Sequence, residues 1–142
     1  MIVCLIFCPY KTIVRLRTYN REFDNSPLDI LYPIAYNIIV KQIIYYTTSD
    51  NKCPYLDWYN SLDKSIRKRI DMRIDKLEEG YYGDCKCISN DLFELRCKFG
   101  SGYRIYFTEE ENILVLILCA GDKSTQKKDI QKAKDIIEEI KE

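Results

Sequence analysis

The chain contains no histidine among its 142 residues. This absence excludes Ser-His and Cys-His nucleophilic catalysis, histidine metal ligands and histidine acid–base chemistry. An enzyme built on this sequence must therefore work with Lys, Arg, Tyr, Asp, Glu or Cys. Basic and acidic residues number 22 each, so the chain also lacks an excess of either charge. Any anion-binding site would have to come from a local cluster of cations.

Long apolar runs are also absent, and no stretch reaches the length of a transmembrane helix. The opening MIVCLIFCPY has a short apolar run with no basic segment before it, which is atypical of a signal peptide. The seven cysteines are scattered, without the spacing of a zinc site. They are typical of reduced thiols that pack as small apolar groups. We expect a cytoplasmic protein without a membrane segment, metal or cofactor.

The composition changes near residue 40. Residues 1–39 contain three prolines and no sustained period, so we expect a poorly ordered extension. This extension suggests a mis-annotated start, with the true start near Val40. Mass spectrometry of the native N-terminus tests this hypothesis, and an intact peptide from residues 1–35 would contradict it. Residues 40–142 have the length of a single domain.

Two helices are predicted after a first strand at about 40–47, which is rich in β-branched and aromatic residues. Pro54 is suited to the first position of a short helix. A second helix is expected over about 64–79, because isoleucine and leucine recur there at helical spacing. Gly80 ends it. The two helices form a helical hairpin.

Three strands with short turns follow, at about 91–99, 103–109 and 113–119, and a helix with one apolar stripe comes after Gly121. Short turns indicate antiparallel neighbours. The predicted fold class is therefore α+β, an antiparallel β-sheet with an N-terminal helical hairpin and a C-terminal helix packed on it.

The segment CAGDKSTQKK, residues 119–128, joins the last strand to the last helix. Its composition is close to that of a nucleotide-binding loop, but the glycine that a Walker loop requires five residues before its Gly-Lys is missing. A helix that begins near Ser124 or Thr125 would still present N–H groups and a partial positive charge, with Lys123 beside them. The segment is either an anion-binding helix start or an ordinary N-cap.

Two arginines strengthen the anion-binding interpretation. In the predicted hairpin around Gly100-Ser101-Gly102, side-chain alternation can bring Arg96 and Arg104 onto one face of the sheet. With Lys123 they would line a single concave surface. Like charges repel there unless an anion is present, which is a functional signal. The alternative is that each arginine is an ordinary solvated surface charge.

Several motifs occur in the order of a known family. They are YYTTSDNKCPYLDWYNSL, RKRIDMRIDKLEEGYYGDCK, ELRCKFGSGYRIYF and LVLILCAGDKSTQKKDIQKAK. This series resembles the RelE/ParE superfamily of toxins, and more closely its HigB-like "addiction module killer" branch. The resemblance covers about residues 41–140. It implies a toxin of a type II toxin–antitoxin system, with a cognate antitoxin as partner, typically a helix-turn-helix protein.

The usual activity in the superfamily is cleavage of mRNA in the ribosomal A site, with the ribose 2′-hydroxyl as nucleophile. By resemblance, Arg104 matches an arginine that clamps the scissile phosphate. Lys123 and Arg96 fall near further cationic positions, and Lys123 is favoured for charge stabilisation. Tyr106 is a candidate proton donor because it shares the face of Arg104. The family's C-terminal catalytic tyrosine has no match here, and Glu94 stands where a lysine is common.

RNA contacts are expected from further basic and hydroxyl side chains. The candidates are Lys98, Arg67, Lys68, Arg69, Arg73, Ser124 and Thr125. The cluster on the second helix is equally consistent with a solvated helix face. Two other functions stay open beside an mRNA endoribonuclease: a ParE-like toxin that binds DNA gyrase without cleaving nucleic acid, and an inactive remnant.

Overall fold

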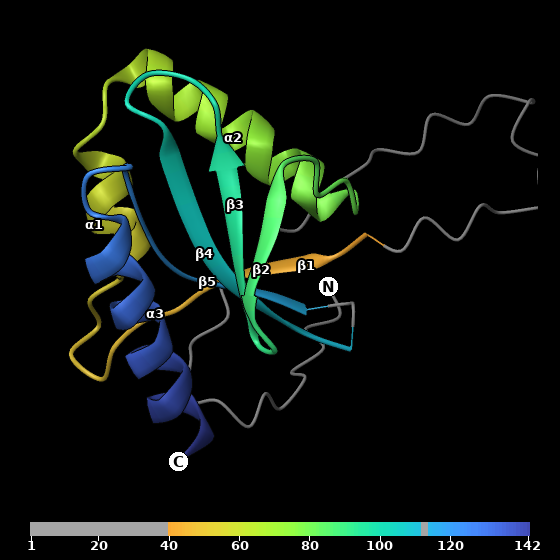
Figure 1. The fold of residues 1–142 in the computed structure, drawn as a ribbon, viewed down its shortest axis with the longest axis vertical. Helices are drawn as coiled ribbons and strands as arrows, with labels where there is room; N and C mark the ends of the chain where they lie inside the picture. Colours follow the sequence, from red (N-terminus) through yellow and green to blue (C-terminus); the bar gives the residue numbers. More distant parts are fainter. Residues whose placement is uncertain (1–39, 112–113) are drawn as a thin grey trace, which may run out of the picture.

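The computed structural model describes residues 40–111 and 114–142 (Figure 1). The prediction for residues 1–39 lies outside the described residues. The elements are β1 (Gln42–Tyr45), α1 (Pro54–Asn60), α2 (Lys64–Glu78), β2 (Cys85–Ser89), β3 (Leu92–Cys97), β4 (Tyr103–Glu110), β5 (Leu114–Gly121) and α3 (Gln126–Lys141). The predicted helical hairpin, meander and closing helix are therefore present in the expected order.

The five strands form one sheet in the order β1-β5-β4-β3-β2. Strands β3, β4 and β5 are antiparallel neighbours, as predicted, and β2 pairs with β3 in antiparallel orientation as well. The sheet is nevertheless mixed, because β1 pairs with β5 in parallel, with Gln42 opposite Leu114. Turn lengths could not reveal this pairing, since the whole helical hairpin and the meander lie between β1 and β5 in the sequence. The α+β class is confirmed, with one parallel pairing added.

Strand β2 was missing from the sequence prediction. It is only five residues long, with the sequence CKCIS, and its side chains are exposed or half-buried. It pairs with β3, placing Cys85 opposite Leu95, and the register shifts between Cys87 and Ser89. As an edge strand with a bulge it carries little of the apolar alternation on which strand prediction depends.

The sheet separates two apolar clusters. On one face, Ile70, Ile74 and Leu77 of α2 and Tyr55 of α1 pack against strand residues that include Leu95 and Ile105. On the other face, the apolar side of α3 packs against the alternate strand residues. This second cluster contains Ile44, Tyr46, Leu92, Tyr106, Leu116, Leu118, Cys119, Ala133 and Ile136. Figure 1 shows α2 and α3 on different sides of the strands. No helix of the described ranges is long and apolar enough to cross a bilayer.

The turn between β3 and β4 depends on glycine. Gly100 and Gly102 have φ values of 57° and 76°, which side chains with a Cβ rarely adopt. Gly102 donates its N–H to the carbonyl of Phe99 at 3.1 Å and closes the reversal. The tight turn fixes the register between β3 and β4, and this register positions the arginines.

Candidate functional site

Arg96 and Arg104 are directly opposite each other in the β3–β4 pairing. Opposite residues of an antiparallel pair project from the same face, so the predicted placement of both arginines on one face is confirmed. That face is the α3 side, because Tyr106, two residues from Arg104, packs in the cluster beneath α3. The Arg96 side chain is 35% exposed and that of Arg104 is 14% exposed, so the pair is partly withdrawn from water.

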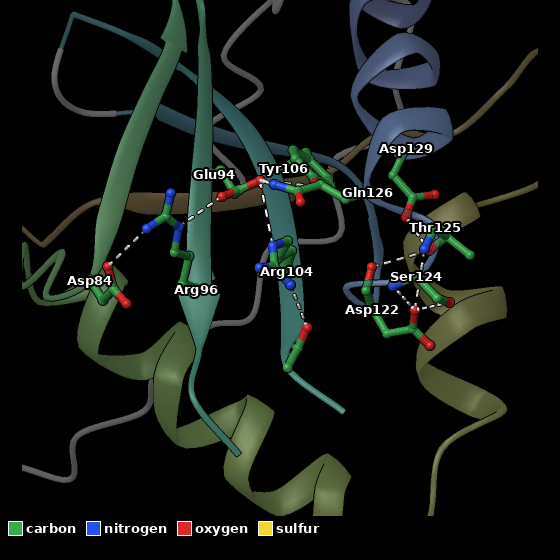
Figure 2. A network of polar contacts seen from close by, with 11 residues as sticks. Asp84, Glu94, Arg96, Arg104, Tyr106, Asp122, Ser124, Thr125, Gln126 and Asp129 are labelled. Carbon is green, nitrogen blue, oxygen red and sulfur yellow. Dashed lines mark hydrogen bonds and ion pairs between the residues drawn. The ribbon is translucent and has the colours of Figure 1, made fainter. Parts of the chain in front are cut away.

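A buried carboxylate lies between the two guanidinium groups (Figure 2). Glu94 is fully buried. Its Oε1 accepts a hydrogen bond from Arg96 Nε at 2.8 Å. Its Oε2 lies 3.7 Å from Arg104 Nε and accepts hydrogen bonds from Gln126 at 2.8 Å and Tyr106 at 3.1 Å. Sequence analysis noted Glu94 only as a departure from the family pattern, and it did not identify Gln126.

The charge state of Glu94 follows from these contacts. Burial raises the pKa of the carboxyl. Hydrogen bonds from Arg96, Gln126 and Tyr106 lower the pKa by more than burial raises it, so the net pKa lies below the ordinary value. Conversely, the hydrogen bond to Glu94 raises the pKa of Arg96. The centre of the site is therefore an ionised carboxylate between two permanent cations.

The predicted role of Tyr106 as proton donor to a substrate is contradicted by its position. The residue is fully buried, and its hydroxyl donates to Glu94 inside the protein. Burial, reinforced by the charge of Glu94, raises the pKa of the Tyr106 phenol. The hydroxyl thus holds the carboxylate in place and does not face a ligand.

The base of the Lys123 side chain lies near Arg104. A Cβ placed on Gly102 would be 3.6 Å from Arg104 Nη1 and 3.9 Å from Lys123 Cβ, so all three residues meet at the β3–β4 turn. Arg104 Nη1 donates to the Gly102 carbonyl at 2.8 Å. Its Nε is buried and makes no hydrogen bond to any described residue. This atom faces Glu94 Oε2 at 3.7 Å inside the protein, so it is held by the carboxylate's charge and is not open to a ligand.

The junction before α3 contains a carboxylate, that of Asp122, which accepts hydrogen bonds from the backbone of the junction. The Asp122 carboxylate accepts hydrogen bonds from the backbone N–H groups of Ser124 at 2.8 Å and Thr125 at 3.3 Å. These bonds, with that of the Ser124 hydroxyl first among them, lower the pKa of Asp122. The N–H groups of Ser124 and Thr125 are therefore occupied within the chain. The Ser124 and Thr125 hydroxyls bond to Asp122 as well, while the N-cap residue Thr125 makes no side-chain hydrogen bond to the backbone of the first turn of α3.

The basic residues of α2 lie on the other face of the sheet from the arginine pair. Arg73 donates to the carbonyls of Tyr82, Asp84 and Arg96, so its guanidinium is not available to RNA. Arg67 donates to the carbonyl of Leu62 at 2.9 Å. The remaining two predicted contacts are exposed, with Arg69 stacked 4.0 Å above the ring of Phe99 and Lys68 pointing to solvent. The α2 cluster does not extend the arginine site.

Asp84 adds a second carboxylate at the β2 side of the site. Its Oδ1 is 3.9 Å from Arg96 Nη1, and its Oδ2 is 3.2 Å from Lys98 Nζ. The Lys98 side chain is 82% exposed, so this pair is weak and a phosphate can compete for the lysine. Lys98 thus borders the arginine face, in agreement with its predicted position.

A cavity lies at the other end of the sheet. Its apolar lining comes from Leu114, Leu116, Ile137 and Ile140. It also includes Thr108, four positions along β4 from Arg104, which corresponds to about 13 Å of extended strand. This cavity is separate from the arginine site. No group of acidic and cysteine side chains in the described ranges has the geometry of a metal site.

The fold defines the class of protein. The chain superposes on a solved structure of a double mutant of the E. coli toxin RelE in the free state, with a TM-score of 0.50 and 14% sequence identity. The match covers 68% of this chain and 98% of that one. At this identity the likeness concerns the fold alone, and it confirms a RelE-type architecture.

The sequence gives the particular family. The family described as "Phage derived protein Gp49-like (DUF891)" matches residues 57–141. The chain therefore belongs to the Gp49-like family, a RelE/ParE-type toxin family. An "Uncharacterized protein" of Haemophilus influenzae (strain ATCC 51907 / DSM 11121 / KW20 / Rd) is 44% identical over 85 residues, which are 58% of this chain and 85% of that protein. The predicted superfamily is confirmed, and the HigB-like branch stays a prediction.

Proposed function

We propose that this chain is the toxin of a type II toxin–antitoxin system and that it cleaves mRNA on the ribosome without a metal or cofactor. The observation that carries the proposal is the pair formed by Arg96 and Arg104 on one face of the sheet, with Lys123 beside Arg104. Membership of a RelE/ParE-type toxin family supports it.

The proposed reaction is a transesterification. The ribose 2′-oxygen attacks the adjacent phosphorus, the bond from phosphorus to the 5′-oxygen breaks, and a 2′,3′-cyclic phosphate and a 5′-hydroxyl result. Negative charge accumulates on the phosphoryl oxygens in the transition state. Arg104 binds these oxygens in our proposal, while Lys123 stabilises the charge from the exposed side. Arg96 contributes positive potential rather than a direct contact, because its Nε is bonded to Glu94.

The proton transfers involve fewer groups than in a histidine enzyme. Tyr106 and Glu94 are buried and hydrogen-bonded to each other, which removes both from direct proton exchange with substrate. Lys123 is exposed and is the remaining candidate to protonate the leaving 5′-oxygen. We propose that the proton of the 2′-hydroxyl passes to a group of the ribosomal RNA or to solvent water.

The proposed partners follow from this assignment. A cognate antitoxin, typically a helix-turn-helix protein, would neutralise the toxin by covering the cationic face or displacing α3. The HigB-like branch is our assignment within the superfamily. The site of action would be the cytoplasm, because ribosomes and mRNA are there.

Growth and RNA measurements on the full chain test the proposal. Induced expression should arrest growth with rapid loss of mRNA, and co-expression of the protein encoded next to it should relieve the arrest. Arg104→Ala should lower the cleavage rate by about 10²–10³-fold, as loss of one preorganised donor to a developing oxyanion does. Lys134→Ala removes one exposed positive charge from α3 and is the matched control, with unchanged activity expected.

Other outcomes would support the alternatives. Growth arrest with a DNA-damage response and stable mRNA would indicate a ParE-like toxin that binds gyrase. Absence of any arrest would indicate an inactive remnant. Equal toxicity of the Arg104→Ala variant would contradict the site assignment even if the chain proves to be a nuclease.

A further inference from the structure

The Glu94 carboxylate gathers several side chains on the α3 face of the sheet. Three side chains donate hydrogen bonds to it: Arg96 to Oε1, and Gln126 and Tyr106 to Oε2. Arg104 adds an ion pair at 3.7 Å without a hydrogen bond. These donors come from β3, β4 and the first turn of α3, so one carboxylate connects three elements (Figure 2).

This arrangement solves an electrostatic problem of the site. Like charges placed directly opposite each other on neighbouring strands repel, and Arg96 and Arg104 are so placed. A carboxylate between them offsets that repulsion. It fixes the direction of the Arg96 guanidinium through a hydrogen bond, and it attracts the Arg104 guanidinium, which the Gly102 carbonyl also holds. Burial of a carboxylate is costly in itself, and it is tolerated only because the oxygens are fully hydrogen-bonded. Two solvated surface arginines would need no such group.

We infer that Glu94 is a positioning residue of the proposed nuclease site: it holds Arg96 beside Arg104 while Arg104 binds the scissile phosphate, and through Gln126 it connects this arrangement to the start of α3. This inference rests on the proposed function for its catalytic consequence. The geometric part, which concerns how the arginines are held, is independent of the reaction.

A role as general base is excluded by position. A base must come within hydrogen-bond distance of the 2′-hydroxyl, directly or through one water. The Glu94 side chain has no exposed surface, and the Tyr106 hydroxyl and the Gln126 amide occupy the oxygen that faces α3. A carboxylate in this place acts on the reaction through the arginines and not by contact with RNA.

The test compares Glu94→Gln with a matched control in the full chain. The control is Glu109→Gln, which neutralises a carboxylate that is 10% exposed and paired with Lys41 at 3.0 Å, away from the arginines. Each variant is assayed for cleavage of mRNA bound to programmed ribosomes, under single-turnover conditions and across pH. For Glu94→Gln we expect the maximal rate to fall by about 10- to 100-fold. The ribosome concentration at half-maximal rate should change far less, because a misplaced arginine weakens binding of the transition state more than binding of the substrate.

The pH profile separates positioning from proton transfer. A positioning role predicts a lower profile of unchanged shape in Glu94→Gln. Loss of the acidic limb of the profile would show that Glu94 is the base, and would overturn the inference. An unchanged rate in Glu94→Gln would overturn it as well, as would an equal fall in Glu109→Gln, because the effect would then follow from any lost buried charge.

A spectroscopic readout makes the test independent of cleavage. In a nitrogen-15 spectrum of the arginine Nε–H groups, the Arg96 signal should be protected from solvent exchange in the wild-type chain and in Glu109→Gln. It should shift and exchange faster in Glu94→Gln. If the wild-type chain cleaves no RNA, the proposed function fails, and an unchanged Arg96 signal in Glu94→Gln would separately overturn the inference.

Gln126→Ala serves if Glu94→Gln does not fold. This variant removes only the amide that α3 donates to Oε2 at 2.8 Å, at a half-buried position. We expect a rate reduced by roughly 3- to 10-fold, the range of one ordinary hydrogen bond, because Arg96 and Tyr106 still hold the carboxylate. A rate equal to that of the wild type would show that α3 is not coupled to the arginines.

Discussion

At the scale of single residues, the packing around Gly121 explains why a glycine stands at the junction between β5 and α3. A Cβ at Gly121 would lie 2.0 Å from Asp129 Oδ2 and 2.6 Å from Thr125 Oγ1. The Thr125 hydroxyl and Asp129 are themselves hydrogen-bonded. The glycine therefore lets the first turn of α3 close onto the end of β5. The sequence drew attention to this segment as a possible phosphate loop, while its structural purpose is close packing between a strand and a helix.

Gly121→Ala should lower the free energy of unfolding by about 1–3 kcal/mol, because the Asp129 carboxylate must rotate away and lose its bond from Thr125. Urea denaturation measures the change. Adding Asp129→Ala to Gly121→Ala should recover part of the loss, since the main steric conflict is then removed. Additive losses in the double variant would contradict the proposed contact.

Acid stability reports on Glu94. Its folded pKa lies below the ordinary value of 4.5, so its contribution to stability is complete above that pH and is lost as the pH falls through 4.5 and below. Glu94→Gln should therefore be less stable than the wild type at neutral pH, and the difference should shrink as the pH falls toward about 3. Denaturation at a series of pH values measures this. A difference that is constant with pH would contradict a depressed pKa.

Sequence reasoning identified Arg96, Arg104 and Lys123, but not what holds them. Alternation along two strands joined by a short turn fixes which side chains share a face, so the arginine pair could be predicted. The contact between Glu94 and Gln126 joins residues 32 positions apart across the packing of α3 on the sheet, and no local pattern encodes it. The alternation did place Glu94 on the face of Arg96 and Arg104. An acidic residue on the same face as two arginines was the signal that could have indicated their ion pairs with Glu94.

At the scale of elements, Arg73 holds α2 to the strands it covers. Its guanidinium donates to main-chain carbonyls before β2 and at the end of β3. A Cβ at Gly83 would lie 2.9 Å from Arg73 Nη2, which shows how closely the loop after α2 approaches this side chain. The position of Arg73 on the helix suggested a surface cation, whereas the structure uses it as an internal connection.

Arg73→Met should destabilise the fold by about 1.5–3 kcal/mol, because carbonyls that were bonded to a charged donor lose it. Lys68→Met, at an exposed position of the same helix, should change the stability by less than about 0.5 kcal/mol. Thermal and urea denaturation of both variants make the comparison. Similar losses in the two variants would show that the carbonyl contacts are unimportant.

Among the elements, length and periodicity decided what could be predicted. The helix α2 and the strands β4 and β5 are long and regular, and their predicted bounds agree with the structure to within about two residues. Strand β2 has five residues and a bulge, so it lacked a pattern. The parallel pairing of β1 with β5 depends on where two distant segments meet, and it follows from the packing of the helical hairpin rather than from either strand.

At the scale of the whole molecule, the cysteines report on global stability. Burial raises the pKa of Cys97 to about 11 and that of Cys119 to about 12. Both thiols are therefore protonated and shielded near neutral pH. Cys87 on the edge strand β2 is exposed, so it serves as an accessible thiol for comparison with the two buried ones.

Alkylation at about pH 8 should modify Cys87 rapidly and Cys97 and Cys119 only at the rate of global unfolding, because the thiolate is the reactive form. Peptide mapping by mass spectrometry measures the modification of each site. The two buried thiols should react with the same rate constant if the domain unfolds as one unit. Fast reaction of Cys119 alone would indicate that α3 separates from the sheet without unfolding the rest.

The parallel pairing of the first strand with the last has a consequence for biosynthesis. Residues 42–45 can pair in the sheet only after residues 114–117 have been synthesised. Gln126, which begins α3, is synthesised later still. Contacts between such distant segments form slowly and late. A nascent chain emerging from the exit tunnel can build the β3–β4 hairpin but not the finished arrangement around it. The sheet therefore closes only after residues 114–117 have left the exit tunnel, long after its first strand has done so.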